Sequence, residues 1–529
     1  MHQGPSPSME TNKTTALAPL GERVAIPQSR ESRVRGISQD SETSVVTLDV
    51  GTSSVRTLLF DAHGCEVQGF GVQLPYQVVT TAEGGVEADG DELSELAVRS
   101  FCGIHAQMKA SGLRPAAVAS CTFWHNVLGV GEDGRPTTPV IHLFDTRSAG
   151  AAKRLAERID ARRQHARTGC ELHASYLPAK LLWLSEARPD VFRVTRRWMS
   201  FGEYLFLKLF GKAVASTSMV SGSGLWNQHE NSYDEEILTV LPIERSQLSP
   251  VEEMDQPLTD LQPDYKARWP EFGGIPWYPA LGDGACNNIG SGCHSPERFA
   301  LMVGTSGALR AVSEAPRINI PKGLWCYRVD RRRYVLGGAL SNGGSVLQWM
   351  QRTLALPSEE RLDTALAALM PGSHGLTMVP LFAGERSTGW RAEARAAIAG
   401  LNMHTSSLDI LRAGLEAVAL RFRNVYEVMV ERLGAPSEVV ASGGALSLLA
   451  SWTQMMADAL GRPVLTCLER ETTSRGAALL CLERLGAVRH VGEVSTPMAR
   501  TFEPVPGHTE IYDQELQRQR RLYTLLFEA

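Results

Sequence analysis

The sequence lacks the paired cysteines of a disulfide framework. Its nine cysteines are odd in number, widely scattered, and include no CxxC pair. Such a set is typical of reduced thiols in a cytosolic protein. We therefore expect a cytoplasmic protein without structural disulfides.

Long apolar runs and an excess of positive charge are also missing. No stretch of about 18 apolar residues occurs, so no transmembrane helix is predicted. The opening residues MHQGPSPSMETNKTT lack the apolar segment of a secretory signal. A formal net charge of −5 gives no electrostatic attraction to nucleic acid or to an acidic membrane surface. We expect neither nucleic acid nor a membrane as a partner.

The length and the pattern of elements favour two α/β domains. The chain has 529 residues, of which 43% are hydrophobic and 21% charged, as in ordinary globular proteins. Strand and helix patterns alternate in two halves, which we place at residues 44–280 and 281–529. Residues 1–43 are rich in Ser, Thr, Pro and charge, and are predicted to be a disordered extension.

A strand–turn–strand pattern at residues 45–61, VVTLDVGTSSVRTLLFD, is the first candidate for chemistry. Two β-rich runs flank the small-residue turn Gly51-Thr52-Ser53-Ser54, whose backbone N–H groups could approach a phosphate. Asp49 precedes the turn, where a carboxylate can hold Mg²⁺, and Arg56 follows it as a source of positive charge. The alternative is an ordinary tight hairpin. The stretch is not a Walker A loop, because no Gly-Lys-Ser/Thr follows.

A second copy of this pattern favours the phosphate interpretation. Residues 299–312 read FALMVGTSGALRAV, and their Gly304-Thr305 follows Gly51-Thr52 at an offset of 304 − 51 = 253 residues. An offset of domain size suggests two related hairpins, one in each half. Met302 stands where the first copy has Asp49. Both turns could bind phosphate, but only the first brings a carboxylate for a metal ion.

These hairpins belong to a series of motifs that resembles one known family. In order, the motifs are LDVGTSSVR, TFWHN, HLFDTRS, LPAKLLWL, GDGACNNIGSG, MVGTSGA, GGALSNGGSVLQW, LFAGERSTGW and ASGGALSLLASWTQMMADALGRPV. The chain resembles the FGGY carbohydrate kinases of the actin-like ATPase superfamily, and most of all their gluconokinase-type members. The resemblance implies two actin-like (ribonuclease H-like) domains, each a mixed sheet flanked by helices. ATP and sugar would bind in the cleft between them.

The resemblance also implies roles for individual residues on the sugar side. Asp283 would be the general base that takes the proton of the sugar hydroxyl. Trp124, His125, Asp145 and Arg147 would contact the substrate. The alternative for Asp283 is a helix N-cap. For the others it is a core Trp, a satisfied His and a surface ion pair.

The nucleotide side is predicted from both halves. The residues expected to bind ATP are Gly51, Thr52, Ser53, Arg56, Gly304, Thr305, Gly344, Gln348, Gly443 and Gly444. Gly344 and Gln348 lie four apart on one face of a predicted helix, and Gly443-Gly444 links a strand to a helix. Each glycine could equally be a plain turn or cap.

The predicted reaction is transfer of the ATP γ-phosphoryl group, with Mg²⁺ held near Asp49, to a sugar-type hydroxyl. The preferred acceptor is D-gluconate, which would give 6-phosphogluconate, with Arg147 or His125 pairing with its carboxylate. Xylulose, another pentulose or a polyol such as glycerol is the first alternative. An actin-like ATPase or a catalytically silent sugar-binding relative is the second. The oligomeric state stays open, with a homodimer as one option.

Overall fold

The computed structural model describes residues 43–315 and 317–528. The chain divides into two units, residues 1–41 and 42–529, and the described residues belong to the second. The predicted disordered extension, apart from residue 43, lies outside the described residues. In this part of the chain, no helix is both long and apolar enough to cross a membrane.

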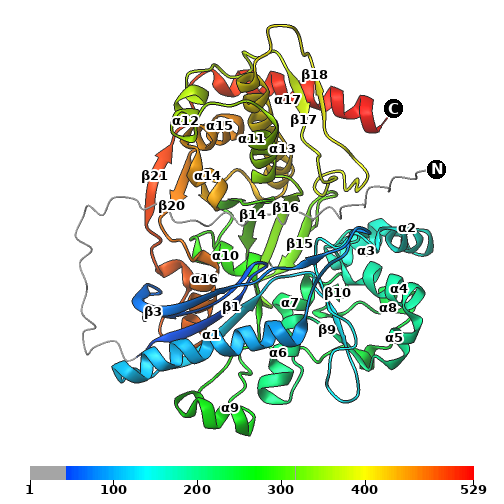
Figure 1. Ribbon diagram of the computed structural model, residues 1–529, viewed down its shortest axis with the longest axis vertical. Helices are drawn as coiled ribbons and strands as arrows, with labels where there is room; N and C mark the ends of the chain where they lie inside the picture. Colours follow the sequence, from blue (N-terminus) through cyan, green and yellow to red (C-terminus); the bar gives the residue numbers. More distant parts are fainter. Residues whose placement is uncertain (1–42, 316, 529) are drawn as a thin grey trace, which may run out of the picture. The chain divides into compact units, whose positions relative to one another are not determined.

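The first hairpin is the centre of a five-stranded mixed sheet with the order β12-β6-β1-β2-β3. Its strands are β1 (Val45–Val50), β2 (Ser54–Phe60), β3 (Glu66–Pro75), β6 (Ala117–Thr122) and β12 (Leu281–Gly282). Strands β1, β6 and β12 are parallel, and β2 and β3 are antiparallel to their neighbours. Every residue of β1 and β6 is buried, as expected for strands covered on both faces. Helix α1 (Gly90–Ser111) packs on one face through Leu93, Phe101 and Ile104 (Figure 1).

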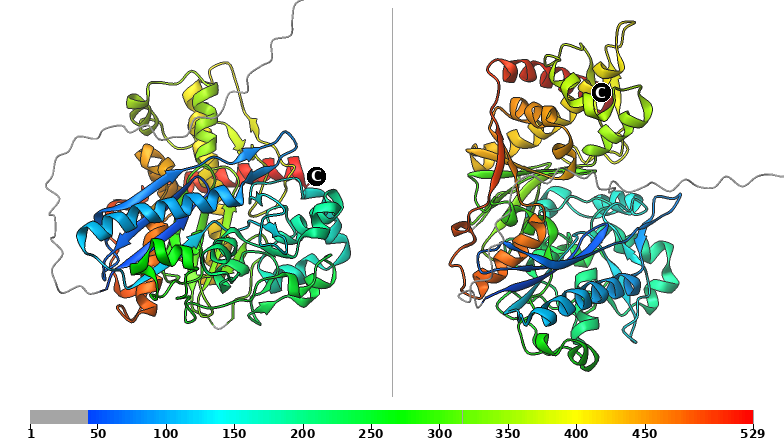
Figure 2. Two further views of the ribbon diagram at one scale, coloured as in Figure 1. Left: turned by 60° about the horizontal axis from the view of Figure 1, so that its bottom comes forward. Right: turned by 60° about the vertical axis from the view of Figure 1, so that its left-hand side comes forward.

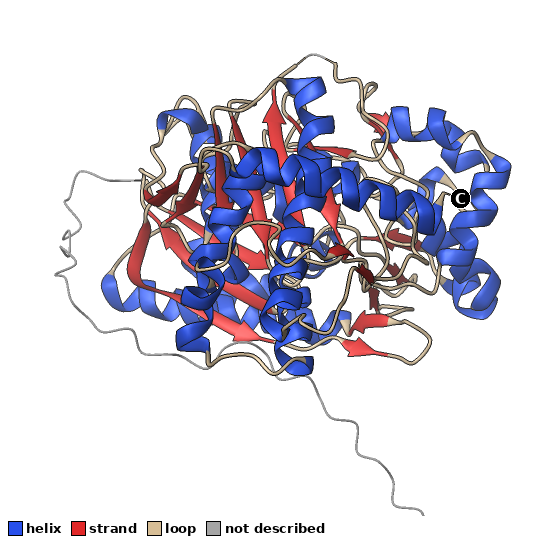
Figure 3. Ribbon diagram, turned by 90° about the horizontal axis from the view of Figure 1, so that it is seen from above, coloured by secondary structure: helices blue, strands red, loops and turns tan. Residues whose placement is uncertain are grey.

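The second hairpin lies in a seven-stranded mixed sheet with the order β15-β16-β14-β13-β19-β20-β21. Its strands are β13 (Arg298–Val303), β14 (Gly307–Ser313), β15 (Trp325–Arg328), β16 (Tyr334–Leu340), β19 (Glu438–Ser442), β20 (Val464–Cys467) and β21 (Met498–Phe502). One face is covered by helices that include α11 (Gly344–Thr353), α13 (Ser407–Leu433) and α15 (Ala450–Leu460). Figure 3 shows helices on both sides of the strands.

Two helices, α10 (Asp283–Gly290) and α16 (Thr472–Arg484), form a layer between the sheets (Figures 1 and 2). They cross where glycines let the backbones touch. A Cβ on Gly290 would lie 1.8 Å from the carbonyl oxygen of Thr472, and one on Gly476 would lie 1.8 Å from that of Cys286. These two positions therefore need glycine.

The strand predicted to open the second half belongs to the first sheet. The sequence predicts a strand at Leu281, and β12 begins there, but it pairs with β6. Helix α16 likewise returns from the second half to pack on β1 and β6. The division at residue 280 stays a prediction about domains, and the first sheet extends two residues beyond it.

The remaining elements complete the two halves. The helices are α2 (Ala149–Arg158), α3 (Ala161–Thr168), α4 (Leu177–Ala187), α5 (Pro189–Val194), α6 (Phe201–Phe210), α7 (Thr217–Ser221), α8 (Glu235–Thr239), α9 (Pro263–Arg268), α12 (Glu359–Ala367), α14 (Gly444–Leu448) and α17 (His508–Phe527). The short strands are β4 (Val79–Thr80), β5 (Val86–Ala88), β7 (Leu128–Val130), β8 (Val140–Ile141), β9 (Arg197–Met199), β10 (Trp226–Asn227), β11 (Ser232–Tyr233), β17 (Thr377–Val379) and β18 (Ala397–Ala399).

Candidate active site

The candidate site lies where three parallel strands of the first sheet end. Asp49 is the penultimate residue of β1, the loop from Phe123 to Asn126 follows β6, and Asp283 follows β12 directly. Register places Asp49 beside Cys121, and Cys121 beside Leu281. The carboxyl ends of parallel strands are where open α/β sheets usually bind ligands.

Asp49 is buried, with 1% of its surface exposed, and one of its two carboxylate oxygens has no partner. Oδ2 accepts a hydrogen bond from the hydroxyl of Ser474 at 3.2 Å and lies 3.7 Å from Arg56. Oδ1 is buried and has no hydrogen bond by geometry to a described residue, although the thiol of Cys121 lies beside Asp49 and acts to lower its pKa. Burial raises the pKa of Asp49 to about 6, against the opposing effect of Arg56. A free carboxylate oxygen in this position fits a Mg²⁺ ion or one of its waters.

Asp283 is the first residue of α10, and the N-cap position belongs to Gly282. Asp283 is therefore not the N-cap residue, which was the alternative role, but the first residue of the helix. Burial raises the pKa of Asp283, while the nearby Arg310 guanidinium and backbone N–H groups lower it. Its Oδ1 accepts from the N–H of Gly284 at 2.8 Å. The helix N-terminus and Arg310 both favour the ionised form.

Arg310 joins the two sheets at this point. It extends from β14 of the second sheet and donates to the side-chain oxygen of Asn287 in α10 at 3.0 Å. Only 6% of Arg310 is exposed, and its Nε is buried without a partner among the described residues. Burial lowers the pKa of Arg310 to about 10, and Asp283 opposes this effect. The guanidinium stays charged at neutral pH and keeps donor capacity.

The ring of Trp124 packs against the first residues of α10. Its ring fills the space beside Gly282 and Gly284, where added Cβ atoms would lie 1.9 Å and 2.6 Å from the indole. Its Nε1 donates to the carbonyl oxygen of Ser218 at 2.9 Å, and 4% of the residue is exposed. This geometry favours a positioning role for Trp124, and a sugar contact stays a prediction.

His125 is held in one tautomer. Its Nδ1 lies 2.6 Å from the carbonyl oxygen of Gly222, so Nδ1 carries the proton and Nε2 is an acceptor. Burial and the charge of Arg386 lower the pKa of His125 well below its usual range. The buried Lys180 donates to the carbonyl oxygens of His125 and His142 at 2.6 and 2.8 Å, and burial lowers its pKa to about 7. His125 is therefore neutral.

Asp145 and Arg147 are paired with each other. The Asp145 carboxylate accepts from the backbone N–H of Val86 and from the backbone and guanidinium N–H groups of Arg147. Arg147 also forms an ion pair with Glu87, and its guanidinium lies 4.6 Å from the ring centre of Trp183. The charge of Arg147 is thus neutralised within the protein. Neither Arg147 nor the neutral His125 offers the positive charge that we expected for a substrate carboxylate.

The two hairpin turns differ in their surroundings. In the first, Thr52 and Ser53 are exposed, Gly51 donates to the Ser54 carbonyl at 3.0 Å, and Tyr76 donates to the Gly51 carbonyl at 2.6 Å. In the second turn Thr305 is exposed. Its neighbour Gly304 accepts a bond of 2.7 Å from the N–H of Gly344, the first residue of α11.

The predicted glycines of the second half gather around the second turn. A Cβ on Gly344 would lie 2.7 Å from the Gly304 oxygen, and one on Gly443, at φ +98°, would lie 2.5 Å from that of Val303. Gly444 faces open space, and Gln348 is half-buried on α11. The structure therefore brings Gly304, Gly344 and Gly443 together.

Several neighbours of these residues were missed by reasoning from the sequence. Ser474 contacts Asp49 from a position 425 residues away, which no local pattern reveals. Tyr76 and Arg386 likewise lie in stretches with no assigned role. Arg310 had a signal that could have found it, since it follows the second Gly-Thr-Ser turn much as Arg56 follows the first.

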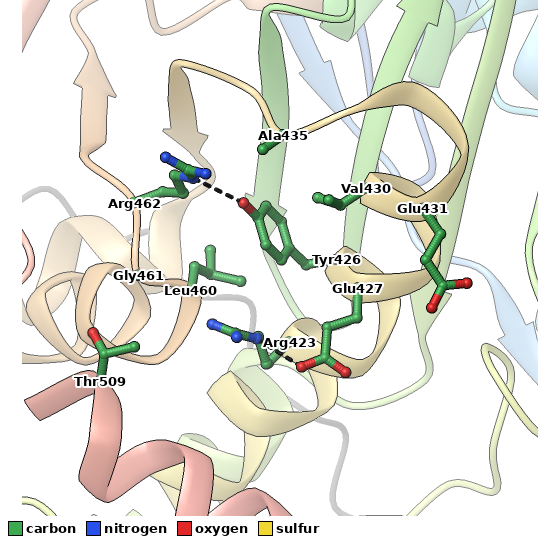
Figure 4. A pocket seen from close by; sticks show the side chains of 10 residues that line it. All are labelled: Arg423, Tyr426, Glu427, Val430, Glu431, Ala435, Leu460, Gly461, Arg462 and Thr509. Atoms are coloured by element: carbon green, nitrogen blue, oxygen red, sulfur yellow. Dashed lines mark hydrogen bonds and ion pairs between the residues drawn. The ribbon is translucent and has the colours of Figure 1, made fainter.

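A cavity of about 430 Å³ lies elsewhere, between α13, α15 and α17 (Figure 4). Both arginines of its lining are engaged, since Arg423 donates to Glu427 and Arg462 donates to the hydroxyl of Tyr426, and its Glu431 is exposed. It offers no free group of the kind that Asp49 and Arg310 present. We assign it no ligand.

Comparisons with known proteins identify the class. The N-terminal and C-terminal domains of the FGGY family of carbohydrate kinases match residues 44–290 and 299–483. The chain is 26% identical to the gluconokinase of Bacillus subtilis (strain 168), over 87% of this chain and 91% of the relative. It is 30% identical to the glycerol kinase of Verminephrobacter eiseniae, over 83% and 90%.

Solved structures show the same fold. The gluconate kinase of Lactobacillus acidophilus superposes with a TM-score of 0.85 at 24% identity, covering 92% of this chain and 98% of that one. A ligand-bound xylulose kinase from the same organism gives the same values. Because the two domain models match most of the chain, it belongs to the FGGY family of carbohydrate kinases. It is a phosphotransferase with an alcohol group as acceptor, built on the two-domain, actin-like fold that the sequence predicts.

Proposed function

We propose that this kinase transfers the γ-phosphoryl group of ATP to the terminal hydroxyl of a sugar acid, D-gluconate, to give 6-phosphogluconate. The observation that carries the transfer is the pair of carboxylates at the ends of parallel strands, the buried Asp49 and the half-buried Asp283. One has a free oxygen for a metal ion, and the other lies beside an arginine from the opposite sheet.

On the acceptor side, Asp283 orients the hydroxyl and takes its proton. Arg310 and the helix N-terminus keep Asp283 ionised, and its raised pKa makes it a better proton acceptor than an exposed aspartate. Trp124 fixes the start of α10 and thereby the position of Asp283. The free donors of Arg310 are placed to stabilise charge on the transferred group.

On the nucleotide side, the two hairpin turns present their backbone N–H groups and the hydroxyls of Thr52, Ser53 and Thr305 to the phosphates. The nucleoside approaches along Gly443-Gly444, where Gly444 leaves open space. Asp49, held by Ser474 and Arg56, would bind Mg²⁺ through its free Oδ1, directly or through water. When bound, the ion neutralises phosphate charge.

The choice of gluconate is supported by the similarity of this chain to gluconokinases. The motifs TFWHN, HLFDTRS, LPAKLLWL and GERSTGW together resemble gluconokinase-type members, and gluconokinases are among the relatives at 26% identity. Glycerol and xylulose kinases are similar as well, which keeps a polyol or pentulose kinase as the alternative.

The test is kcat/KM for gluconate, xylulose, ribulose, glycerol and erythritol at one concentration of Mg–ATP. We expect gluconate to lead. A neutral ketose or polyol that exceeds gluconate tenfold, which corresponds to about 1.4 kcal/mol in transition-state stabilisation, would contradict the gluconate assignment. The assignment to the kinase family would stand.

A further inference from the structure

The segment Gly384–Ser387 presents one arginine whose neighbours are firmly anchored. Glu385 is buried, forms an ion pair with Arg421, and accepts from the Tyr523 hydroxyl at 2.6 Å. Ser387 bonds to Ala339 of β16 through both its backbone N–H, at 2.9 Å, and its hydroxyl, at 3.1 Å. Arg386 lies between these two anchors, so its backbone position is fixed.

The Arg386 side chain, by contrast, has no acidic partner. No carboxylate of the described residues lies within ion-pair distance of it, and its Nε is buried without a hydrogen bond. Its guanidinium carbon lies 5.8 Å from the ring centre of Trp390. A buried donor of this kind is costly unless a ligand or an ordered water supplies the acceptor.

The rings of Trp390 and Tyr176 connect Arg386 to His125 on the acceptor side of the site. Burial and the positive charge of Arg386 both lower the pKa of His125 and of His173, which for His173 falls to about 3. Burial raises the pKa of Tyr176, and the charge of Arg386 opposes that effect. Aromatic contacts link these groups. The ring centre of Trp390 lies 5.3 Å from that of His173 and 6.1 Å from that of Tyr176, whose ring centre lies 5.1 Å from that of His125. The surroundings of Arg386 are thus neutral and ring-lined.

The other cations near the acceptor residues are already engaged. Arg147 is paired with Asp145 and Glu87, Lys180 donates to two backbone carbonyls, and Arg310 lies beside Asp283. Arg386 alone among these four has no counter-charge or bonded acceptor. A positive charge in neutral, ring-lined surroundings is the complement of one carboxylate on a carbon chain.

We propose that Arg386 binds the carboxylate of the acceptor and so selects a sugar acid over neutral sugars and polyols. This inference rests on the proposed function, since it needs an anionic acceptor. It replaces the earlier expectation that Arg147 or His125 takes the carboxylate. Because the carboxylate lies at the opposite end of gluconate from the reacting hydroxyl, Arg386 should act on binding rather than on chemistry.

The experiment compares D-gluconate with D-glucitol, which has the same carbon chain and a neutral CH₂OH in place of the carboxylate. The variant Arg386→Gln removes the charge, and Arg386→Lys keeps it without the planar fork. We expect Arg386→Gln to lower kcat/KM for gluconate about 10- to 100-fold, mostly through KM. The value for glucitol should change less than threefold. Arg386→Lys should recover part of the loss.

Arg391→Gln is the matched control. Arg391 lies in the same segment, but its guanidinium already contacts the hydroxyl of Tyr523 and the carboxylate of Glu528. This variant should keep the wild-type preference for gluconate over glucitol. Thermal unfolding of every variant shows whether a loss of activity reflects a loss of folded protein.

Each outcome decides the proposal. If the wild-type enzyme prefers gluconate and Arg386→Gln retains that preference, or loses activity on both acceptors equally, Arg386 does not read the carboxylate and the proposed function survives. If the wild-type enzyme shows no preference for gluconate over glucitol, both the sugar-acid function and the role of Arg386 are wrong.

Discussion

Asp49 is buried and Asp283 is half-buried, and their different neighbours suit them to the different roles that we propose. Both pKa values are raised by burial. Asp283 has an arginine and a helix N-terminus beside it, which suits a group that must be ionised before it accepts a proton. Asp49 retains an oxygen with no partner, which suits a metal ligand.

The first prediction concerns Asp283→Asn. The amide keeps the size of the side chain but cannot accept the proton, so kcat should fall about 10²- to 10⁴-fold while ATP binding and the melting temperature stay close to wild type. Steady-state kinetics and nucleotide titration measure these quantities. The exposed Asp264→Asn is the control and should behave as wild type. More than about a tenth of wild-type kcat in Asp283→Asn would exclude Asp283 as the base.

The second prediction concerns Asp49→Asn and the free energy of unfolding. The pKa of Asp49 is about 6 in the folded protein against 3.8 without the protein environment. The folded state therefore holds the proton more tightly, and stability falls as pH rises from about 4 through 6. Above pH 6 the ionised carboxylate costs folding about 3 kcal/mol.

Asp49→Asn should therefore melt a few degrees higher than wild type at pH 8 in metal-free buffer, with a gain about half as large at pH 5. It should also lose activity and need much more Mg²⁺ for whatever remains. Millimolar Mg²⁺ should stabilise the wild type and not the variant. Equal melting temperatures at both pH values, with an unchanged Mg²⁺ requirement, would make Asp49 a residue of the turn alone.

At the scale of elements, the site depends on two helices that lie far apart in the sequence, although both fall within residues 281–529. Helix α10 carries Asp283 and helix α16 carries Ser474, and they meet at Gly290 and Gly476. This contact sets the position of the hydroxyl that bonds to Asp49. The N-terminal ends of both helices thereby lie close to the two carboxylates.

The same elements show what could be predicted from the sequence. Strands β1 and β2 follow from apolar, β-branched runs around a small-residue turn, and the motif series gives the family and fold. The strand with which another strand pairs could not be predicted, because the residues at Leu281 indicate a strand but not the sheet to which it belongs. Ser474 beside Asp49 and the unpaired Arg386 arise only from packing between distant segments, which local patterns do not encode.

At the scale of the whole molecule, the residues that we propose for the acceptor and for the nucleotide follow strands of different sheets. The acceptor residues follow β6 and β12 of the first sheet, and the glycines around Thr305 follow β13 and β19 of the second. Arg310 and the α10–α16 layer connect the two. Phosphoryl transfer therefore requires both halves of the molecule to be correctly positioned relative to the reacting groups. We expect an acceptor to be needed for rapid turnover.

The last prediction follows from this requirement. Without an acceptor, ADP release should be below about 1% of the rate with saturating gluconate, because water gains none of the contacts that position the sugar hydroxyl. A coupled assay of ADP release measures both rates, and Asp283→Asn in the same assay reports any contaminating ATPase. ADP release that is equally fast with and without acceptors would favour an actin-like ATPase. No release with any sugar, sugar acid or polyol would favour a silent binding protein. Strict dependence on the acceptor is what a kinase built across two sheets requires.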